Sequence, residues 1–378
     1  MSDITPAING QGRFAFIQIL RGVAAMLVVW SHLSGFWLLD VGKTSFLQTR
    51  WERWIVGPFH IFQNGGHLGV VIFFLISGYI ITHTSLREDR PTFLVRRVFR
   101  IFPMLIVATA IAFGFFVLSL LTHTKLIGIS GGSVLHWLSS LVLVDGFLPG
   151  GRAMDVTWTL VVELIFYTMT FALLGVSRIH PLRSVWIMLG IWVVLSVVSL
   201  DLGPIHRSAN SEVALYVGFL IIGRVIYLVQ QKLIAVVDAL VAGGLALLLY
   251  CLFIEVAEPG FLIAPGGYRG MEPIVTYAFA LIIFLAMMRL APSTVVQPFK
   301  MLGDISYSLY LLHIPVGITV LNLLNAVGVP TDVNVIVAIL ASIGVAWITH
   351  HFVELPAQRL ARRIRPTKRR EEPSPEFR

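Results

Sequence analysis

Apolar runs that are long enough to cross a lipid bilayer recur along the whole chain and predict its architecture. A helix needs about 20 residues to span the hydrocarbon, and a run of high hydropathy marks it. We expect helices throughout, because lipid offers no water to unpaired backbone groups. The predicted spans are residues 14–39, 66–84, 94–121, 156–175, 185–200, 212–231, 233–254, 272–290, 304–327 and 333–353. The predicted fold class is all-α, a polytopic transmembrane helix bundle of about ten spans.

Positive charge in the short loops predicts the orientation of these spans. Five arginines lie between Arg87 and Arg100, after the second span, and seven basic residues lie between Arg359 and Arg370, after the tenth. Ten spans place both clusters on one side, so the positive-inside rule makes both termini cytoplasmic. Segment 133–144 is apolar but short, and counting it as a span would put the basic tail outside. We expect it to be a re-entrant or interfacial helix on the outer side.

The composition fits a membrane protein and excludes several kinds of site. Hydrophobic residues make up 57% of the 378 residues and charged residues 13%, about half the charged fraction of a soluble domain. Cys251 is the single cysteine, which excludes an internal disulfide and a CxxC site. The scattered histidines lack ligand spacing, so no metal site is expected, and no nucleic-acid-binding motif accompanies the basic tail. We expect a cytoplasmic arm at 1–13, a membrane domain at 14–356 and a disordered basic cytoplasmic tail at 357–378.

The first span carries two polar side chains that are costly at membrane depth. Arg21 and His32 are eleven residues apart, which offsets them by about 20° around a helix and about 16 Å along it. Intramembrane residues of this kind usually face a polar cavity or a partner. The pair therefore predicts a helix face that meets water, a substrate or both. The alternative is that Arg21 snorkels to the headgroups and His32 joins an interfacial polar cluster.

Three arginines open the third span in the stretch LVRRVFRIFP. Arg97 and Arg100 are three apart and share a helix face, and Arg96 flanks them. Guanidinium groups form paired hydrogen bonds with phosphate oxygens, so the stretch fits docking of a phosphate-bearing cytosolic substrate. An arginine anchor that grips lipid headgroups is the alternative.

Glu163 is a carboxylate inside the apolar fourth span, several residues below Trp158 in TWTLVVELIFY. Its burial is costly unless the group is protonated, paired or near water. The topology puts Glu163 and His32 in the outer half of the membrane, so the carboxylate is expected to orient or deprotonate the imidazole. A structural ion pair or hydrogen bond to a neighbouring helix is the alternative.

The ninth span contains a polar run, DISYSLYLLHIP at 304–315. The topology places this run in the cytoplasmic half. Tyrosine and histidine three apart lie on one face, so they can line a pocket there. An interfacial tyrosine belt with a packing histidine is the alternative. The expected pocket residues are Ser306, Tyr307, Tyr310 and His313, together with Trp158.

Six motifs in order resemble acyltransferase family 3, a family of integral membrane proteins. They are QILRGVAAMLVVWSH, GVVIFFLISGYIIT, RRVFRIFP, TWTLVVELIFY, ISYSLYLLHIP and FVELP, and they run from about Phe16 to Pro356. The resemblance implies a multi-pass enzyme of the bacterial inner membrane. Such an enzyme moves an acyl group from cytosolic acyl-coenzyme A to an extracytoplasmic acceptor, often a cell-surface glycan.

The resemblance also implies roles for particular residues. The family's essential arginine-x10-histidine pattern matches Arg21 and His32, and its arginine-xx-arginine pattern matches Arg97 and Arg100. The glutamate of its Trp-x4-Glu stretch matches Glu163. Its late Ser-Tyr-x2-Tyr-Leu-x-His run matches Ser306, Tyr307, Tyr310, Leu311 and His313.

Two features depart from the family pattern. Many members carry an acidic residue before the Phe-Phe pair of the second span, where this chain has Val71, so any role of that acid is absent here or has moved. Many members also carry an extracellular SGNH hydrolase-type domain. We expect this chain to resemble the stand-alone subgroup, which includes exopolysaccharide and Nod-factor acyltransferases.

The expected function is O-acyl transfer, most simply of acetyl, with acyl-coenzyme A as co-substrate and no further cofactor. Arg96, Arg97 and Arg100 would hold the donor phosphates and Arg21 would steer the donor. His32 would act as general base or transient acyl carrier towards a glycan or glycolipid. The oligomeric state stays open. A proton-coupled transporter and a non-catalytic component of polysaccharide assembly are the rival hypotheses, because both use intramembrane polar residues.

Overall fold

A computed structural model describes residues 15–123, 129, 132–148, 151–201, 211–257, 272–290 and 297–364. The predicted arm at 1–13 and the tail beyond residue 364 lie outside the described residues. The described chain is helical, with no β-strand beyond one isolated bridge between Ile129 and Met154. This confirms the all-α prediction.

Ten helical segments among the described residues are long and apolar enough to cross a membrane, as predicted, and we treat the chain as a multi-pass membrane protein. Three of these segments, the first, the ninth and the tenth, are interrupted by a π-helical turn. The spanning helices are α1 (Ala15–Trp30) continued by η2 (Ser31–Phe36) and α2 (Trp37–Val41), α5 (Gly66–Ser85), α6 (Arg90–Thr122), α8 (Trp158–Ala172), α10 (Pro181–Asp201), α12 (Val217–Gln230), α13 (Val236–Ala257), α14 (Glu272–Leu290), α15 (Gln297–Leu312) continued by η7 (His313–Ile318) and α16 (Thr319–Ala326), and α17 (Thr331–Thr349) continued by η8 (His350–Glu354) and α18 (Leu355–Ile364). The shorter elements are α3 (Phe46–Trp51), η3 (Glu52–Val56), α4 (Gly57–Phe59), η4 (Phe62–Gly65), α7 (Val134–Ser140), η5 (Asp145–Phe147), η6 (Asp155–Thr157), α9 (Leu174–Ile179) and α11 (Ser211–Leu215).

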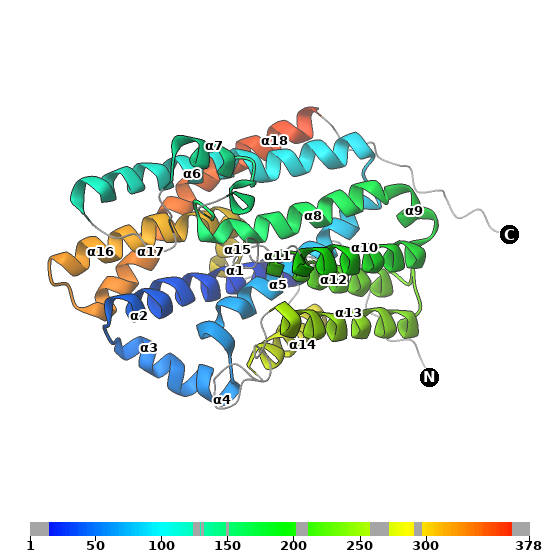
Figure 1. Cartoon of the computed structure of the whole chain (residues 1–378), viewed down its shortest axis with the longest axis horizontal. Coiled ribbons are helices and arrows are strands. Elements are labelled where there is room, and N and C mark those ends of the chain that lie inside the picture. Colours follow the sequence, from blue (N-terminus) through cyan, green and yellow to red (C-terminus); the bar gives the residue numbers. More distant parts are fainter. Residues whose placement is uncertain are drawn as a thin grey trace.

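In the middle of the bundle, α1 packs against both α15 and α5, and α5 in turn packs against α12 (Figure 1). Glycines set the closest approach. A Cβ on Gly78 of α5 would lie 2.0 Å from the Leu220 carbonyl oxygen of α12, and a Cβ on Gly223 would lie 2.2 Å from the Leu75 carbonyl oxygen. Small residues of this kind let helix backbones meet inside a membrane.

Helices α1 and α15 run in the same direction, side by side. The Gln18 side chain donates a hydrogen bond to Asp304 at 3.1 Å. Further along both helices, His32 lies beside His313. A Cβ on Gly303 would lie 2.4 Å from the Gln18 carbonyl oxygen, so this contact also depends on glycine. The first and ninth spans therefore form one wall that displays polar groups from one end to the other.

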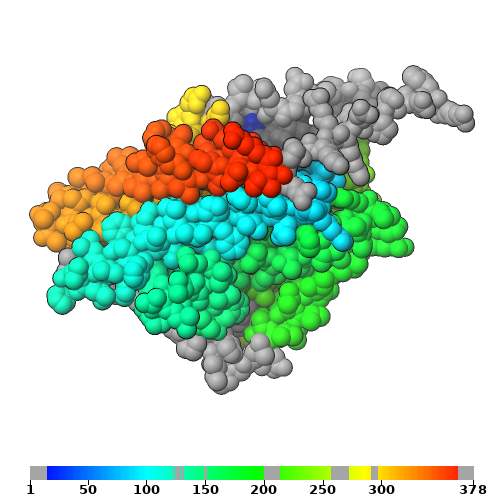
Figure 2. Space-filling view, turned by 90° about the horizontal axis from the view of Figure 1, so that it is seen from above, coloured from blue at the N-terminus to red at the C-terminus, as the bar shows by residue number. Residues whose placement is uncertain are grey.

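Two elements lie on α6 (Figure 2). Helix α7 covers only seven residues, and its Trp137 ring packs against the rings of Phe113 and Phe116, with centroids 5.3 and 5.6 Å apart. The segment predicted at 133–144 is thus a short helix rather than a span, and its outer location stays a prediction.

Helix α18 also lies along α6 and differs from the prediction for the tail. The tail was expected to be disordered from residue 357, but α18 continues to Ile364. The apolar side chains of this basic segment recur at helical spacing, and Ala361 is buried. A helix can therefore form here despite the high charge.

Candidate active site

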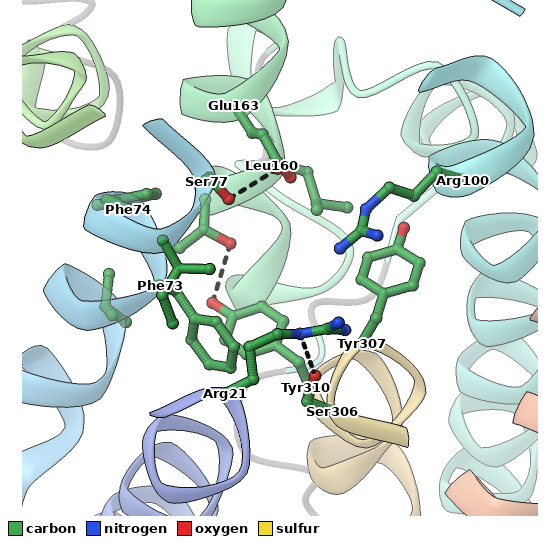
Figure 3. A pocket seen from close by; sticks show the side chains of 13 residues that line it. Arg21, Phe73, Phe74, Ser77, Arg100, Leu160, Glu163, Ser306, Tyr307 and Tyr310 are labelled. Atoms are coloured by element: carbon green, nitrogen blue, oxygen red, sulfur yellow. Dashed lines mark hydrogen bonds between the residues drawn. The ribbon is translucent and has the colours of Figure 1, made fainter. Parts of the chain in front are cut away.

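Three neighbouring cavities at one end of the α1–α15 wall share two lining residues, Arg21 and Arg100. We name these cavities the inner cavity (70 Å³), the vestibule (580 Å³) and the side cavity (230 Å³), and both arginines line all three. Arg21 Nε donates to the Ser306 hydroxyl at 3.1 Å. Figure 3 shows the Arg100 guanidinium entering the inner cavity beside Tyr307. Within the described ranges Arg100 has no hydrogen bond or ion pair, so its donors are available to a ligand.

Glu163 lies with these arginines and not with His32. Its carboxylate accepts hydrogen bonds from the Ser77 hydroxyl at 2.9 Å and the Tyr167 hydroxyl at 2.5 Å, and it lines the inner and side cavities. Glu163 was predicted to contact His32, but its hydrogen-bond partners in the described part of the chain are Ser77 and Tyr167. Depth in the membrane was predicted from position in the span, but helix rotation decides the neighbour, and α8 turns Glu163 towards α5 (Figure 3).

The arginine cluster of α6 divides between two environments. Arg97 lines the side cavity together with Arg100, and it also lies 3.6 Å from the Glu88 carboxylate and donates to Thr84 at 3.2 Å. Arg96 forms a 2.7 Å ion pair with Glu88 and lines none of these three cavities. The structure thus brings Arg97 and Arg100 together, and it places Arg96 apart from them.

The vestibule is the largest of the polar cavities at this end, and it extends from the two arginines towards α18. Lys300 and Arg362 add positive charge to its wall. The rings of Trp347 and His351 lie 4.4 Å apart at the same wall. The remaining lining includes Gln18, Gln297, Asp304, His350, Glu354 and Gln358.

Glu354 is a buried carboxylate of the vestibule that the sequence did not single out. Its oxygens accept hydrogen bonds from Ser308 at 2.8 Å and Gln358 at 3.0 Å, and His350 Nδ1 lies 2.9 Å away. In the sequence Glu354 stands in the motif FVELP, which is one of the six motifs of the family resemblance but gives no role to this carboxylate. Nothing in the sequence indicated Lys300 or Arg362, because basic residues at span ends are common.

The tyrosines of α15 separate this end from the next cavity. Tyr307 donates to the Ile101 carbonyl of α6 at 2.9 Å. The Tyr310 hydroxyl lies 3.0 Å from the Thr159 hydroxyl and 3.3 Å from the Val156 carbonyl of the fourth span. Both tyrosines and Ser306 line the inner cavity, as predicted for a pocket. Trp158 instead packs its ring against Tyr216, with centroids 5.0 Å apart.

His32 lies at a fourth cavity, which we name the distal cavity. It measures 500 Å³ and is lined by His32, Phe36, Leu39, Asp40, Asp155, Ile314 and Ile318. His32 belongs to η2, and its Nδ1 is 2.9 Å from the Val28 carbonyl oxygen. Arg21 and His32 therefore line different cavities, although they were expected to share one helix face.

The neighbour of His32 is His313, whose Nε2 lies 3.3 Å from His32 Nδ1. His313 is fully buried at the start of η7. It was expected in the cytoplasmic half, away from His32, and that placement is corrected here. Because α1 and α15 run in parallel, the end of α15 reaches the same level as the end of α1. The π-helical turns that aim both rings leave no periodic signal in the sequence.

Among the described residues, no group of three or more His, Cys, Asp and Glu side chains could hold a metal ion.

Comparison with known proteins gives a family match over most of the chain. A family model described as an acyltransferase domain matches residues 14–351. The O-acetyltransferase OatA of Staphylococcus aureus is 26% identical over 331 residues, covering 78% of this chain and 53% of the relative. The putative peptidoglycan O-acetyltransferase YrhL of Bacillus subtilis is 24% identical over 335 residues, covering 78% of this chain and 50% of the relative. The chain thus spans about half the length of these curated relatives. No solved structure matches it significantly.

Proposed function

Because this chain belongs to acyltransferase family 3, we propose that it is an O-acyltransferase of the bacterial inner membrane. It transfers an acetyl group from cytosolic acetyl-coenzyme A to a hydroxyl of an extracytoplasmic glycan or glycolipid. The names of the two relatives, an O-acetyltransferase and a putative peptidoglycan O-acetyltransferase, support acetyl as the group and a glycan as the acceptor.

The separation of the arginine cavities from the His32 cavity supports this proposal most. Arg21 and Arg100 line the inner cavity, the vestibule and the side cavity. His32 lines the distal cavity, further along the same helix wall. A transferase that takes its donor from one side of a membrane and its acceptor from the other needs two such openings. The basic loops favour the arginine end as the cytoplasmic one.

The donor would enter through the vestibule. Coenzyme A carries phosphates that pair well with guanidinium groups. Lys300 and Arg362 stand at the vestibule wall, and the Trp347–His351 ring pair offers a surface on which an adenine can stack. The acetylated arm would then pass Arg21 and Arg100 into the inner cavity and extend past the Tyr310 ring, so that the thioester reaches His32. Arg100 is the strongest candidate for contact with acetyl-coenzyme A, because no described residue accepts a hydrogen bond from its guanidinium group.

The acceptor would occupy the distal cavity. The carboxylates of Asp40 and Asp155 line it and can accept hydrogen bonds from sugar hydroxyls. Phe36, whose ring centroid lies 5.4 Å from that of His32, adds an apolar face beside the imidazole. Two carboxylates favour a neutral or positively charged sugar over a polyanion, because like charges repel.

His32 would take the proton of the acceptor hydroxyl as the oxygen attacks the thioester carbonyl carbon. The carbon–sulfur bond breaks, and the coenzyme A thiolate leaves and recovers the proton. A positioned base of this kind contributes about 10²–10⁴-fold in rate. The same nitrogen could carry the acetyl group transiently, in which case the acceptor hydroxyl would attack an acetyl-imidazole.

Purified protein in detergent with radiolabelled acetyl-coenzyme A and a crude surface-glycan fraction tests the proposal. Coenzyme A release and label in the glycan are both measured, for the wild type, for His32→Ala and for His180→Ala. His180 is an exposed histidine between α9 and α10 and serves as the matched control. We expect release and labelling in the wild type and the control, and a residual rate of both in His32→Ala that is about 10²–10⁴-fold lower. Full activity of His32→Ala at equal protein level would remove the histidine from the chemistry.

A further inference from the structure

His313 is fully buried and touches no substrate cavity described here, yet its ring nitrogen faces the nitrogen of His32 at 3.3 Å. We propose that His313 is the positioning residue of the transferase. It holds His32 in the tautomer in which Nε2 is unprotonated, and it stabilises the imidazolium that forms when Nε2 gains a proton during transfer. This role rests on the proposed function. From the sequence it was expected of Glu163 instead.

The carbonyl groups around the two rings define their tautomers. His313 Nδ1 lies 2.8 Å from the Tyr310 carbonyl oxygen and 3.2 Å from that of Leu309. A carbonyl only accepts hydrogen bonds, so His313 Nδ1 carries the hydrogen, and in the neutral ring Nε2 is an acceptor. That bare Nε2 is the atom that faces His32.

The same argument applies to His32. Its Nδ1 lies 2.9 Å from the Val28 carbonyl oxygen, so Nδ1 carries the hydrogen. This hydrogen is shared between Val28 and the bare Nε2 of His313. No described residue forms a hydrogen bond with the remaining nitrogen, Nε2, so its lone pair is available to a ligand in the distal cavity that the ring lines.

The backbone holds the two rings at this distance. Both lie in π-helical turns, η2 and η7, which pack against each other. A Cβ on Gly317 of η7 would lie 2.6 Å from the Leu33 side chain of η2. Glycine at 317 therefore permits the close approach. The π-helical turns of helices are frequent at functional sites, and here they aim two imidazoles at each other.

The pair has a defined part in the reaction. When the acceptor hydroxyl gives its proton to His32 Nε2, its oxygen bonds to the thioester carbon, and the carbon–sulfur bond breaks. The thiolate then recovers the proton from Nε2. While His32 is an imidazolium, its Nδ1–H donates to the His313 lone pair. This is the place that a carboxylate holds in a serine protease triad, where it fixes the tautomer and stabilises the imidazolium.

A spectroscopic measurement tests the tautomers without reference to activity. Protein labelled with 15N-histidine is examined by long-range 15N–1H NMR in detergent, and the ring signals are assigned by their loss in His32→Ala and His313→Leu. We expect both rings to be neutral, with the hydrogen on Nδ1 and a bare Nε2. A hydrogen on Nε2 of His32 would overturn the proposal. If the wild type released no coenzyme A, the proposed function would fail while this spectrum still decided the geometry of the pair.

Kinetics test the effect on transfer. His313→Leu removes the acceptor, and His313→Gln offers an amide oxygen near the position of Nε2. We expect His313→Leu to lower kcat by about 10²-fold, within the range for a positioned base, with KM for acetyl-coenzyme A unchanged. His313→Gln should recover part of kcat. The double variant with His32→Ala should be no slower than His32→Ala alone, because residues that act as a unit are not additive.

A merely structural role predicts different results. It would raise KM, lower the thermal midpoint of both His313 variants alike and make the double variant slower than either single one. Those results, or an unchanged kcat in His313→Leu, would contradict the proposal. His180→Leu controls for loss of an exposed histidine. If His313→Leu does not fold, the kcat of His313→Gln and the wild-type spectrum still decide.

Discussion

Arg21 Nε donates a 3.1 Å hydrogen bond to the Ser306 hydroxyl, which ties the first span to the ninth. Only one of the three guanidinium nitrogens is used in this bond, and the terminal nitrogens have no hydrogen bond within the described residues. Arg100 reaches the same inner cavity from α6 (Figure 3). Two guanidinium groups from different helices therefore border one small space of 70 Å³, which also contains the Glu163 carboxylate.

Loss of Arg100 should weaken donor binding. A hydrogen bond to a charged group contributes about 1.5 kcal/mol or more, so Arg100→Gln should raise KM for acetyl-coenzyme A by about tenfold or more. Arg100→Lys should recover part of the effect, because it keeps the charge but not the fork of donors. Steady-state kinetics of coenzyme A release measures both.

The matched control comes from the same helix. Arg96 pairs with Glu88 at 2.7 Å, outside the cavities. Arg96→Gln should therefore leave KM for the donor unchanged. Equal increases in KM for Arg96→Gln and Arg100→Gln would show that general positive charge, rather than the cavity contact, attracts the donor.

Tyr310 stands between the inner cavity and the histidine pair. Its ring centroid is 6.0 Å from that of His313, and it lines the inner cavity. Tyr310→Ala should remove this partition and admit water to the thioester, so coenzyme A release without acceptor should rise relative to transfer. Tyr310→Phe keeps the ring and should leave the ratio of release to transfer near that of the wild type. A ratio that is the same in all three proteins would argue against a partition.

The contact between α5 and α12 should tolerate no side chain at Gly78. A Cβ there would lie 2.0 Å from a backbone carbonyl oxygen, and overpacking of this kind costs about 1–3 kcal/mol or more. Gly78→Ala should lower the thermal midpoint in detergent. Gly114 of α6 has nothing within 4 Å of its Cβ position, so Gly114→Ala should raise the midpoint slightly, because alanine favours a helix. A midpoint unchanged by Gly78→Ala would contradict the close contact.

Hydropathy was sufficient to predict the ten spans and the short helix near residue 134, because burial of apolar runs in lipid dominates their energy. The polar residues that line the cavities were also visible, since Arg21, His32, Arg100 and Glu163 are unusual at membrane depth. The residues that each of them contacts could not be predicted from the sequence. Glu163 was predicted beside His32, but it bonds Ser77 and Tyr167.

That error has a physical origin. Position in a span fixes the depth of a residue, but helix rotation and tilt fix its neighbour, and they follow from packing of α8 on α5. The π-helical turns at His32 and His313 change the rotation again within one helix. The vestibule residues Lys300 and Arg362 were missed for another reason, because their chemistry is indistinguishable from that of a basic loop.

Transfer across sealed vesicles tests the central claim most directly. Radiolabelled acetyl-coenzyme A is added to the face that carries Lys300 and Arg362, with the surface-glycan fraction enclosed on the other face, and vesicles of opposite orientation serve as the comparison. The account predicts that label reaches the glycan only when the donor meets the Lys300 face, and that His32→Ala lowers the rate of labelling by about 10²-fold or more. Labelling that requires donor and glycan on one face, or that proceeds at the wild-type rate in His32→Ala, would contradict it.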